Sequence, residues 1–397
     1  MRTETVLVAA LSGRGLAASA RRAGYLPLVA DAFGDSDTAE QAAAACCVAD
    51  AARIGFRARP VFAALGALEA AAATPPIGLI LGSGFEDRPK LIAALSRRYR
   101  LIGNSAETVA RAKSPTGLFA LLDTLGIAHP ATQLAPPQDA GGWLSKRIGG
   151  SGGTHVVPAS LAERSPRRYF QRHLAGEPHS VLAVSANDGV HIVGISRQWT
   201  VGSGPRPYRY GGAVGPVQLP PAVDSAMRAA VARVSAALGL VGLVAFDFIL
   251  AGDQPFLIEV NPRPSATLDV FDDADGALFE AHLASCAGQT PQLPVQPGAR
   301  AAAILYADRG PLIAPPIVWP AWTADRPAPG TRVPRYRPIA TVFAAEATAE
   351  AAFDSCRGRL DELAEMLYAQ APNRERNDNA EVQRPRPERL GARSEAR

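Results

Sequence analysis

Three oxygen-bearing side chains lie near the ends of two neighbouring apolar stretches. Asp247 lies in GLVAFDFIL, and Glu259 and Asn261 end the stretch PFLIEVN. The turn 251–254 joins the two stretches, so we expect an antiparallel hairpin with Asp247 opposite the other two side chains. Glu259 and Asn261 share one face because side chains alternate along a strand. Two carboxylates and an amide oxygen are the hard ligands that Mg²⁺ prefers, with Mn²⁺ as an alternative ion.

A half-exposed surface hairpin is the competing interpretation of these residues. Apolar residues occupy both faces of VAFDFIL and FLIEV, however, which indicates a buried hairpin. A buried carboxylate without a metal ion or a cationic partner is costly. The pattern therefore predicts that Asp247, Glu259 and Asn261 meet a divalent cation or another positive charge.

A lysine followed by a glycine-rich loop is the second candidate site. Residues 146–155 read KRIGGSGGTH. Such a loop presents backbone N–H groups to a polyphosphate, while the ammonium of Lys146 neutralises its charge. The chain keeps three lysines (Lys90, Lys113 and Lys146) among 41 basic residues, which favours a specific need for a compact ammonium. The lysine precedes the glycines, so the motif is not a Walker A loop, and a flexible hairpin is the alternative.

A third motif, GRGLAA at 13–18, matches the G-x-G-x-x-A dinucleotide fingerprint, and Asp31 ends the next apolar stretch. The glycines would turn tightly against a pyrophosphate, and the acid would bind a ribose. This motif supports a different class of function, an NAD(P)-binding oxidoreductase. Such a function would leave the Lys146 loop and the Glu259 hairpin without a role. A glycine turn in a doubly wound domain that binds another ligand, or none, is the preferred interpretation.

The elements that must position these motifs change in type along the chain. Strand-like stretches at 5–10, 26–31 and 78–84 alternate with helical ones such as 60–73, which predicts a parallel, doubly wound α/β domain. Residues 107–126 are expected to form one helix. Short strands predominate afterwards, and the tail has almost no large apolar residue, so it is expected to be disordered. The predicted parts are 1–106 (α/β), 107–290 (α+β, with a small lid subdomain at about 130–180), 291–371 (β-rich, with a final helix) and 372–397 (disordered tail).

Composition excludes several classes of function. The chain has 397 residues, of which 47% are hydrophobic and 20% charged, as in ordinary globular proteins with two or three domains. Its four cysteines have no zinc spacing, which favours a cytoplasmic location, and no signal peptide precedes the first strand. The apolar run 238–250 is too short to span a membrane. The net charge of +4 comes without a basic, aromatic stripe, so nucleic acid is not an expected partner.

A lysine, a glycine-rich loop and a D-x11-E-x-N hairpin in this order resemble the ATP-grasp superfamily. The resemblance extends to about residue 290, and residues 300–345 resemble the β-rich closing segment of biotin-carboxylase-like members. It implies a doubly wound pre-ATP-grasp domain, a two-subdomain ATP-grasp fold and a β-rich C-terminal segment. Members of the superfamily hold ATP between the two subdomains. They activate a carboxylate as an acyl phosphate, which an amine or another nucleophile then attacks.

The resemblance also assigns roles to individual residues. One group would contact the phosphates of ATP and the metal ion: Lys113 and Lys146, the mobile-loop residues Ser151, Gly152 and Gly153, and the Mg²⁺ ligands Asp247, Glu259 and Asn261. Arg263 matches an arginine near the transferred phosphate, and Arg209 in RPYRYGG is a second anion clamp, with a structural role in a turn as the alternative. The catalytic candidates are Arg263, Lys146 and Arg209.

The nucleoside side of the predicted site lies in RYFQRHLAGEPHS. Gln171 stands where the family usually has a glutamate that accepts a hydrogen bond from the adenine amino group, and its amide oxygen can still accept that bond. The backbone of Leu174 would meet the adenine ring. Either Glu177 or His179 would hold the ribose.

The expected function is an ATP-dependent ligase for a small carboxylate and a small amine. EVNPRP together with the YGG segment resembles a carboligase-like branch related to biotin carboxylase and tyramine–glutamate ligase, which implies glutamate ligation in the synthesis of a one-carbon-carrier cofactor. The acceptor is expected near Gly13–Gly15 and 82–89. Bicarbonate activation as in biotin carboxylase, the oxidoreductase and an ATP-binding scaffold without turnover are the alternatives. A homodimer is the default expectation for an enzyme of this size.

Overall fold

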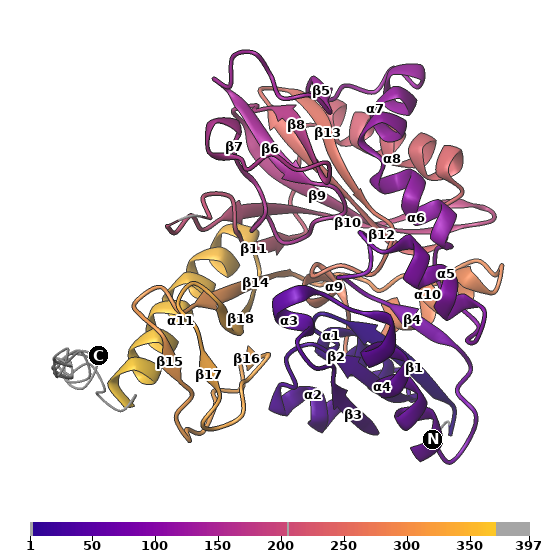
Figure 1. The fold of residues 1–397 in the computed structure, drawn as a ribbon, viewed down its shortest axis with the longest axis vertical. Coiled ribbons are helices and arrows are strands. Elements are labelled where there is room, and N and C mark those ends of the chain that lie inside the picture. Colours follow the sequence, from indigo (N-terminus) through magenta and orange to yellow (C-terminus); the bar gives the residue numbers. More distant parts are fainter. Residues whose placement is uncertain (1–2, 205, 371–397) are drawn as a thin grey trace, which may run out of the picture.

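The computed structural model describes residues 3–204 and 206–370, and its N-terminal domain is a parallel sheet between helices (Figure 1). The sheet order is β3-β2-β1-β4, which confirms the expected doubly wound domain. Its strands are β1 (Thr5–Ala10), β2 (Leu26–Asp31), β3 (Ala44–Cys47) and β4 (Leu79–Leu81). Its helices are α1 (Arg14–Arg22), α2 (Ser36–Gln41), α3 (Ala51–Ile54), α4 (Ala58–Ala71) and α5 (Pro89–Ser96).

Strand β1 is buried on both faces because TVLVAA directs alternate side chains into two hydrophobic cores. Val6 and Val8 pack in a core with residues of α1, and Leu7 and Ala9 pack in another with residues of α4. The first core continues into the next part of the chain through residues such as Phe279. The face of the parallel sheet that α1 covers therefore shares its core with the rest of the molecule.

An eight-stranded antiparallel sheet forms the centre of the molecule, in the order β13-β12-β9-β10-β11-β14-β18-β16. Its strands are β9 (Glu177–Ala186), β10 (Gly189–Thr200), β11 (Tyr210–Gly215), β12 (Gly242–Ala251), β13 (Gln254–Asn261), β14 (Ala299–Tyr306), β16 (Thr323–Ala324) and β18 (Pro338–Glu346). Helices α8 (Pro221–Leu238), α9 (Leu268–Phe271) and α10 (Ala277–Cys286) pack against it. Because β14 pairs with β11, the C-terminal segment extends this sheet.

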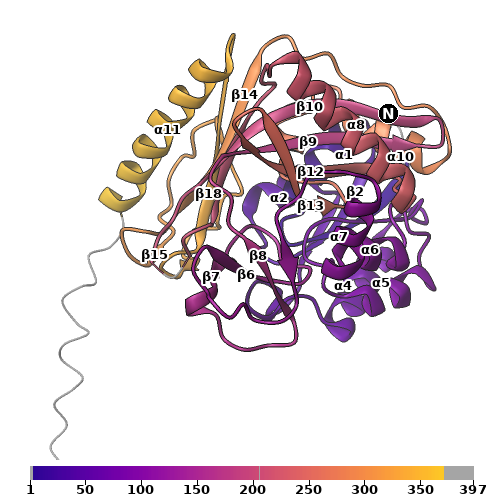
Figure 2. The same ribbon diagram turned by 90° about the horizontal axis from the view of Figure 1, so that it is seen from above.

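A second, four-stranded sheet forms the predicted lid, in the order β5-β8-β6-β7. Its elements are β5 (Thr132–Gln133), β6 (Trp143–Arg147), β7 (Val157–Pro158), β8 (Arg168–Arg172) and the short helix η1 (Ala159–Leu161). Figures 1 and 2 both show this sheet beside β13. The lid sheet thus lies next to the β12–β13 hairpin, and a pocket between them is lined by residues that include Lys113, Arg147 and Glu259.

The helix expected over 107–126 is two helices, α6 (Ala106–Lys113) and α7 (Pro115–Thr124). Pro115 has no N–H for the α6 hydrogen-bond ladder, and its ring disfavours a helical Ser114. The hydroxyl of Ser114 instead accepts a hydrogen bond from the N–H of Gly117 at 3.2 Å and caps α7. The break makes Lys113 the last residue of α6, where a cation is favoured by the helix dipole.

The C-terminal segment ends in α11 (Ala349–Gln370), which packs against β14 and β18 (Figure 2). Between those strands, β15 (Leu312–Ile313) and β17 (Arg332–Val333) form a small ladder. The predicted disordered tail at 372–397 lies outside the described residues. Within 3–204 and 206–370, none of the helices combines the length and hydropathy needed to cross a membrane.

Candidate functional site

The predicted hairpin is present, and its register sets Asp247 opposite Glu259. Gly252 adopts a φ of 59° in the turn, a left-handed conformation that glycine tolerates best. The carboxylate of Asp247 accepts hydrogen bonds from the hydroxyl of Ser180 at 2.7 Å and from the amide of Asn261 at 2.8 Å. Asp247 and Asn261 are therefore hydrogen-bonded to each other, and Glu259 lies opposite Asp247 in the register of β12 and β13.

Lys113 supplies the positive charge that this acidic group requires. Its ammonium donates to Glu259 Oε1 at 2.6 Å and to Asn261 Oδ1 at 2.8 Å. Burial alone would raise the pKa of Glu259, but Lys113, together with Lys146 and His155, lowers that pKa overall. Burial, and then the neighbouring Glu259, raise the pKa of Asp247. The cationic partner expected from the sequence is thus a lysine at the end of α6.

The donor set of this hairpin also fits a divalent cation. Its side chains offer carboxylate and amide oxygens, and the side chain of Glu259 is 30% exposed, so an ion can reach it. Among the residues that the structure describes, no group of three or more His, Cys, Asp and Glu side chains is arranged to hold a metal. A cation at this hairpin would therefore use the amide oxygen of Asn261 as its third protein ligand.

Lys146, on the lid strand β6, has a different environment from Lys113. Its side chain is buried, and its ammonium donates to the amide oxygen of Gln171 on β8 at 2.6 Å. Burial lowers the pKa of Lys146, because its hydrogen-bond partner is neutral and the carboxylates of Glu259 and Asp247 compensate only in part. A buried ammonium held by a neutral amide is suited to receive an anion. The sequence did not predict that Gln171 holds this lysine.

The glycine-rich loop after β6 packs against two other parts of the molecule. Gly149 and Gly153 have φ values of 67° and 69°. A Cβ at Gly149 would lie 2.7 Å from the backbone of Asp87, and one at Gly153 would collide with the carbonyl oxygen of Tyr208. The N–H of Tyr210 donates to the carbonyl of Gly152 at 3.1 Å. Ser151 and Gly152 thus lie at the tip of a loop that rests on the chain before β11.

The predicted nucleoside residues lie along β8 and β9. Gln171 is buried, Leu174 is half-buried and Glu177 is exposed. His179 is 2% exposed, its Nδ1 lies 3.2 Å from the carbonyl oxygen of Glu177, and burial lowers its pKa. Of the two ribose candidates, Glu177 therefore has the free side chain.

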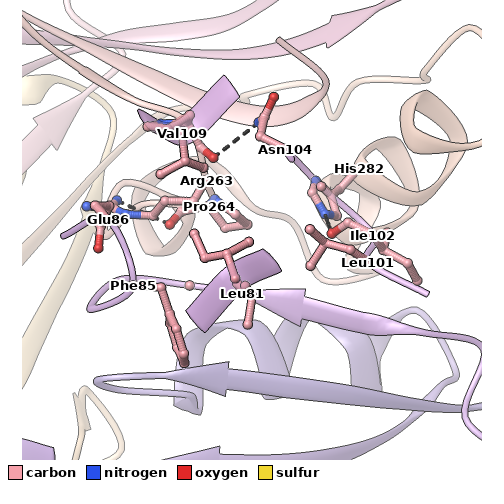
Figure 3. Close-up of a pocket in the computed structure, with 14 residues that line it drawn as sticks. Leu81, Phe85, Glu86, Leu101, Ile102, Asn104, Val109, Arg263, Pro264 and His282 are labelled. Atoms are coloured by element: carbon pink, nitrogen blue, oxygen red, sulfur yellow. Dashed lines mark hydrogen bonds and ion pairs between the residues drawn. The ribbon is translucent and has the colours of Figure 1, made fainter. Parts of the chain in front are cut away.

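Arg263 joins the hairpin to the N-terminal domain (Figure 3). Its Nε donates to Glu86 Oε1 at 2.7 Å, and its Nη2 lies 3.4 Å from Asn261 Oδ1. The other oxygen of Glu86 accepts from the N–H of Gly84 at 2.6 Å. Burial alone would raise the pKa of Glu86, but Arg263 and then Lys113 lower it. Glu86 lies in the expected acceptor segment 82–89 but was not predicted as a site residue; its position after β4 was the available signal.

A small cavity lies beside this ion pair (Figure 3). Its volume of about 20 Å³ has room for roughly one water molecule. Asn104 and His282 line it, but their polar atoms bond to neighbouring backbone groups. The cavity is therefore part of the packing between the domains.

Arg209, predicted as an anion clamp with a structural role in a turn as the alternative, is held by contacts within the protein. Its guanidinium is fully buried, donates to both oxygens of Asp308 at 3.0 and 2.8 Å, and lies 3.6 Å from the centre of the Tyr306 ring. The carboxylate already occupies the two terminal nitrogens that would bind an anion. These contacts favour the alternative prediction, a structural role in the turn before β11.

The dinucleotide-like motif is also occupied by contacts within the protein. Arg14 is buried between Gly13 and Gly15 and pairs with Asp269 at 2.5 Å and Asp325 at 3.0 Å. Asp31 accepts a hydrogen bond from the N–H of Gly34 at 2.9 Å. The motif therefore fastens the N-terminal domain to α9 and the C-terminal segment, in agreement with the preferred interpretation of the glycine turn.

Comparison with known proteins identifies the central part of the chain. The ATP-grasp domain model matches residues 117–267. Carbamoyl phosphate synthase large chain from Rubrobacter xylanophilus is 26% identical over 231 residues, which are 51% of this chain and 21% of that protein. The chain thus spans about a fifth of the length of that relative.

Solved structures share the arrangement of the whole chain. Biotin carboxylase from Campylobacter jejuni, in a complex with β-γ-ATP, matches with a TM-score of 0.67 at 14% identity. The match covers 93% of this chain and 92% of the biotin carboxylase chain. N5-carboxyaminoimidazole ribonucleotide synthetase in an ADP complex matches with a TM-score of 0.65 at 14% identity. That match covers 92% of this chain and 98% of the synthetase chain. At these identities the likeness shows the fold.

A four-stranded lid sheet beside an antiparallel sheet, with Lys146 on the first and Lys113 bonded to the second, is the arrangement that the ATP-grasp domain model and these folds describe. Residues 117–267, which carry the glycine-rich loop and the β12–β13 hairpin, match the ATP-grasp domain model, and the chain shares the fold of biotin carboxylase and of N5-carboxyaminoimidazole ribonucleotide synthetase. The family expected from the order of lysine, glycine-rich loop and D-x11-E-x-N hairpin is confirmed, as is the mixed α/β and α+β fold.

Proposed function

We propose that the chain is an ATP-dependent ligase that joins a small carboxylate to a small amine through an acyl phosphate. The observation that supports this function most is the convergence of cations on one acidic hairpin. Lys113 reaches Glu259 and Asn261 from α6, and Arg263 reaches Asn261 from the loop after β13. Such a group can stabilise the negative charge that develops when a phosphoryl group moves.

The lid would bind ATP from the opposite side. Lys146 carries a buried positive charge with a neutral partner, so phosphate oxygens are the natural acceptors for its ammonium. Ser151, Gly152 and Gly153 would present backbone N–H groups to the same phosphates. Gln171 and the backbone of Leu174 would meet the adenine, and the exposed carboxylate of Glu177 is our choice over His179 for the ribose.

Asp247, Glu259 and Asn261 would hold Mg²⁺, and Mn²⁺ suits the same oxygen donors. When bound, the ion would supply positive charge to the phosphate oxygens. The chain's own contribution is to keep the two carboxylates opposite each other across the hairpin and to neutralise them with Lys113. In this arrangement Lys113 and the ion would share the oxygens of Glu259 and Asn261.

The carboxylate substrate would bind beside Arg263, at the carboxyl edge of the N-terminal sheet, near 82–89 and the Gly13–Gly15 turn. A carboxylate oxygen forms a bond to the γ-phosphorus while the bond between that phosphorus and the β-γ bridging oxygen breaks, and ADP leaves. The amine nitrogen then attacks the acyl carbon, the bond to the phosphate oxygen breaks, and the amine loses a proton to water. Arg263 would stabilise the transferring group, with Lys113 and Lys146 on the remaining charge.

The narrower proposal concerns the substrates. EVNPRP and the YGG segment support the branch that includes tyramine–glutamate ligases, in which glutamate would be the carboxylate and the product would serve a one-carbon-carrier cofactor. A homodimer is proposed on size alone.

The test is ADP formation with MgATP across a panel of carboxylates, including glutamate and bicarbonate, each with and without small amines. Mass spectrometry would detect the amide. We expect ADP only when both substrates are present, and loss of that activity in Lys146→Met. Lys90→Ala, which removes an exposed lysine on α5, is the matched control and should keep full activity.

Three outcomes would contradict this function. ADP formation that depends on bicarbonate alone would indicate bicarbonate activation. Binding of MgATP without turnover under every condition would indicate a scaffold. Tight binding of NAD(P)H without binding of MgATP would indicate an oxidoreductase.

A further inference from the structure

The tip of the glycine-rich loop rests on residues 206–210, a short segment that leads into β11 and includes its first residue. The N–H of Tyr210 donates to the carbonyl of Gly152 at 3.1 Å, and the backbone of Gly153 is in close contact with the carbonyl of Tyr208. Backbone groups therefore form both contacts. The position of the loop tip depends on where the main chain of 206–210 is held.

The C-terminal segment holds that main chain from the opposite side. Asp308 accepts two hydrogen bonds from Arg209, and the Tyr306 hydroxyl donates to the carbonyl of Tyr210 at 2.7 Å. The carbonyl of Tyr336 also accepts from Arg206 at 3.0 Å. In Figure 1, β11 lies between the lid strands β6 and β7 and the C-terminal elements β14 and α11.

The ion pair between Arg209 and Asp308 is the strongest of these contacts. The side chain of Arg209 is 0% exposed, so without Asp308 its charge would be buried and unpaired. The side chain of Asp308 is 35% exposed, so it can be changed without opening a cavity in the core. The stacked Tyr306 ring adds a cation–π contact to the same guanidinium.

We infer that Arg209 and Asp308 are positioning residues for the glycine-rich loop, through which the C-terminal segment controls closure of the loop over the nucleotide. The inference rests on the proposed function in one respect, the assignment of residues 148–156 to ATP. The ion pair acts on the loop through the backbone of Tyr208 and Tyr210 and touches no substrate. It favours the closed loop before ATP binds, and so raises the fraction of protein that is competent to bind ATP.

The experiment is hydrogen–deuterium exchange of full-length protein, followed by mass spectrometry of peptides from 148–156. Asp308→Asn keeps the shape of the side chain and removes its charge. We expect about threefold faster exchange in that loop, with unchanged exchange in residues 79–96 of the N-terminal domain. Calorimetry with the non-hydrolysable MgAMP-PNP should show affinity weaker by about three- to tenfold.

Glu365→Gln is the matched control. It removes the ion pair of the adjacent residue Arg309, whose partner Glu365 lies on α11 and is 73% exposed. Loop exchange and MgAMP-PNP affinity should both equal those of the unmodified protein, because this pair does not touch 206–210. Equal effects of the two substitutions would overturn the inference.

A second variant keeps the test decisive if Asp308→Asn does not fold. Tyr306→Phe removes the hydrogen bond to the carbonyl of Tyr210 and leaves the ring beneath Arg209. It should speed exchange in 148–156 by a smaller factor, whereas an unchanged loop would argue against the inference. If the unmodified protein binds no MgAMP-PNP, the proposed function fails, and the exchange data alone then decide whether the C-terminal segment holds the loop.

Discussion

The two lysines of the candidate site meet opposite environments. Lys113, at the end of α6, is held by the carboxylate of Glu259 and by Asn261. Lys146, on the lid strand β6, is held by the neutral amide of Gln171. Both residues are 8% exposed, so the difference lies in their partners and not in their burial.

The two lysines therefore use their positive charges for different purposes. The charge of Lys113 is used within the protein, where it lowers the pKa of Glu259 beside the carboxylate of Asp247. The charge of Lys146 is left for a ligand, at a cost in folding free energy that a bound anion would offset. Under the proposed function, the hairpin is therefore organised before ATP arrives, whereas bound ATP would complete the lid.

The largest expected effect comes from the carboxylate that Lys113 and the metal ion would share. Glu259→Gln keeps an oxygen for Lys113 but removes the charge that both cations require. We expect ADP formation to fall by about 100- to 1000-fold, the range for the loss of one preorganised electrostatic group. The rate should be measured over a range of Mg²⁺ concentrations, with Glu362→Gln on the exposed face of α11 as the control. An unchanged Mg²⁺ dependence would remove Glu259 from the proposed metal site.

The two lysines should also differ in the sign of their effect on stability. Lys113→Met leaves Glu259 and Asp247 without their cation, and we expect a loss of about 2 kcal/mol in the free energy of unfolding, because Glu259 is partly exposed. Lys146→Met removes a buried charge with a neutral partner, so the free energy should stay equal or rise. Urea denaturation with EDTA measures both variants. Adding Mg²⁺ should then restore part of the stability of Lys113→Met; equal losses in both variants would refute the comparison.

The sequence predicted the hairpin well and its surroundings less well. Alternation and a four-residue turn are local signals, so the amino-acid pattern alone was enough to place Asp247, Glu259 and Asn261 together. The partners of these residues are distant in sequence. Glu86 meets Arg263 across 177 positions and Lys113 meets Glu259 across 146. No local pattern encodes such contacts.

For Arg209 too, the local sequence pattern could not reveal a partner that is distant in the chain. An arginine near a glycine pair is compatible with an anion site. Only the fold shows that the carboxylate of Asp308 accepts hydrogen bonds from both terminal nitrogens of Arg209. The pairing of β14 with β11, which brings these two residues together, joins segments that are far apart in the chain. Family resemblance supplied the roles of Lys113 and Lys146, but not the difference between their partners.

A pH profile should distinguish the two lysines next. Burial lowers the pKa of Lys146, so its ammonium is lost as the pH rises through a value below the ordinary 10.5 of lysine. The kcat/KM for ATP reports the free enzyme and should fall across that alkaline window. Gln171→Glu would give Lys146 a carboxylate, as Lys113 has, and should move the alkaline limb to higher pH. An unchanged limb would mean that another group controls it.

The lowered pKa of Lys146 also makes the free energy of unfolding depend on pH. In the window between the lowered pKa and 10.5, the unfolded chain binds a proton at this lysine that the folded protein does not. This lysine therefore makes the free energy of unfolding rise with pH there. Gln171→Glu should reduce that rise, and urea denaturation at several alkaline pH values would measure it.

The smallest expected effect concerns how each lysine is placed. Lys146 is fixed by strand pairing, but Lys113 depends on the end of a helix, which Ser114 and Pro115 define. Ser114→Ala should cost about 1 kcal/mol, the usual value of a helix cap. Ser105→Ala removes the cap at the opposite end of α6, where the hydroxyl accepts from the N–H of Thr108 at 3.1 Å, and should cost a similar amount.

The two cap variants should nevertheless differ in catalysis. Only Ser114→Ala loosens the turn that carries Lys113, so its KM for ATP should rise by about two- to threefold, while that of Ser105→Ala stays unchanged. Steady-state kinetics with the substrates found in the panel, together with urea denaturation of both variants, would separate stability from placement. An equal KM in the two variants would mean that the contacts with Glu259 and Asn261 hold Lys113 without help from the helix end. The hairpin would then organise both its own carboxylates and the cation that neutralises them.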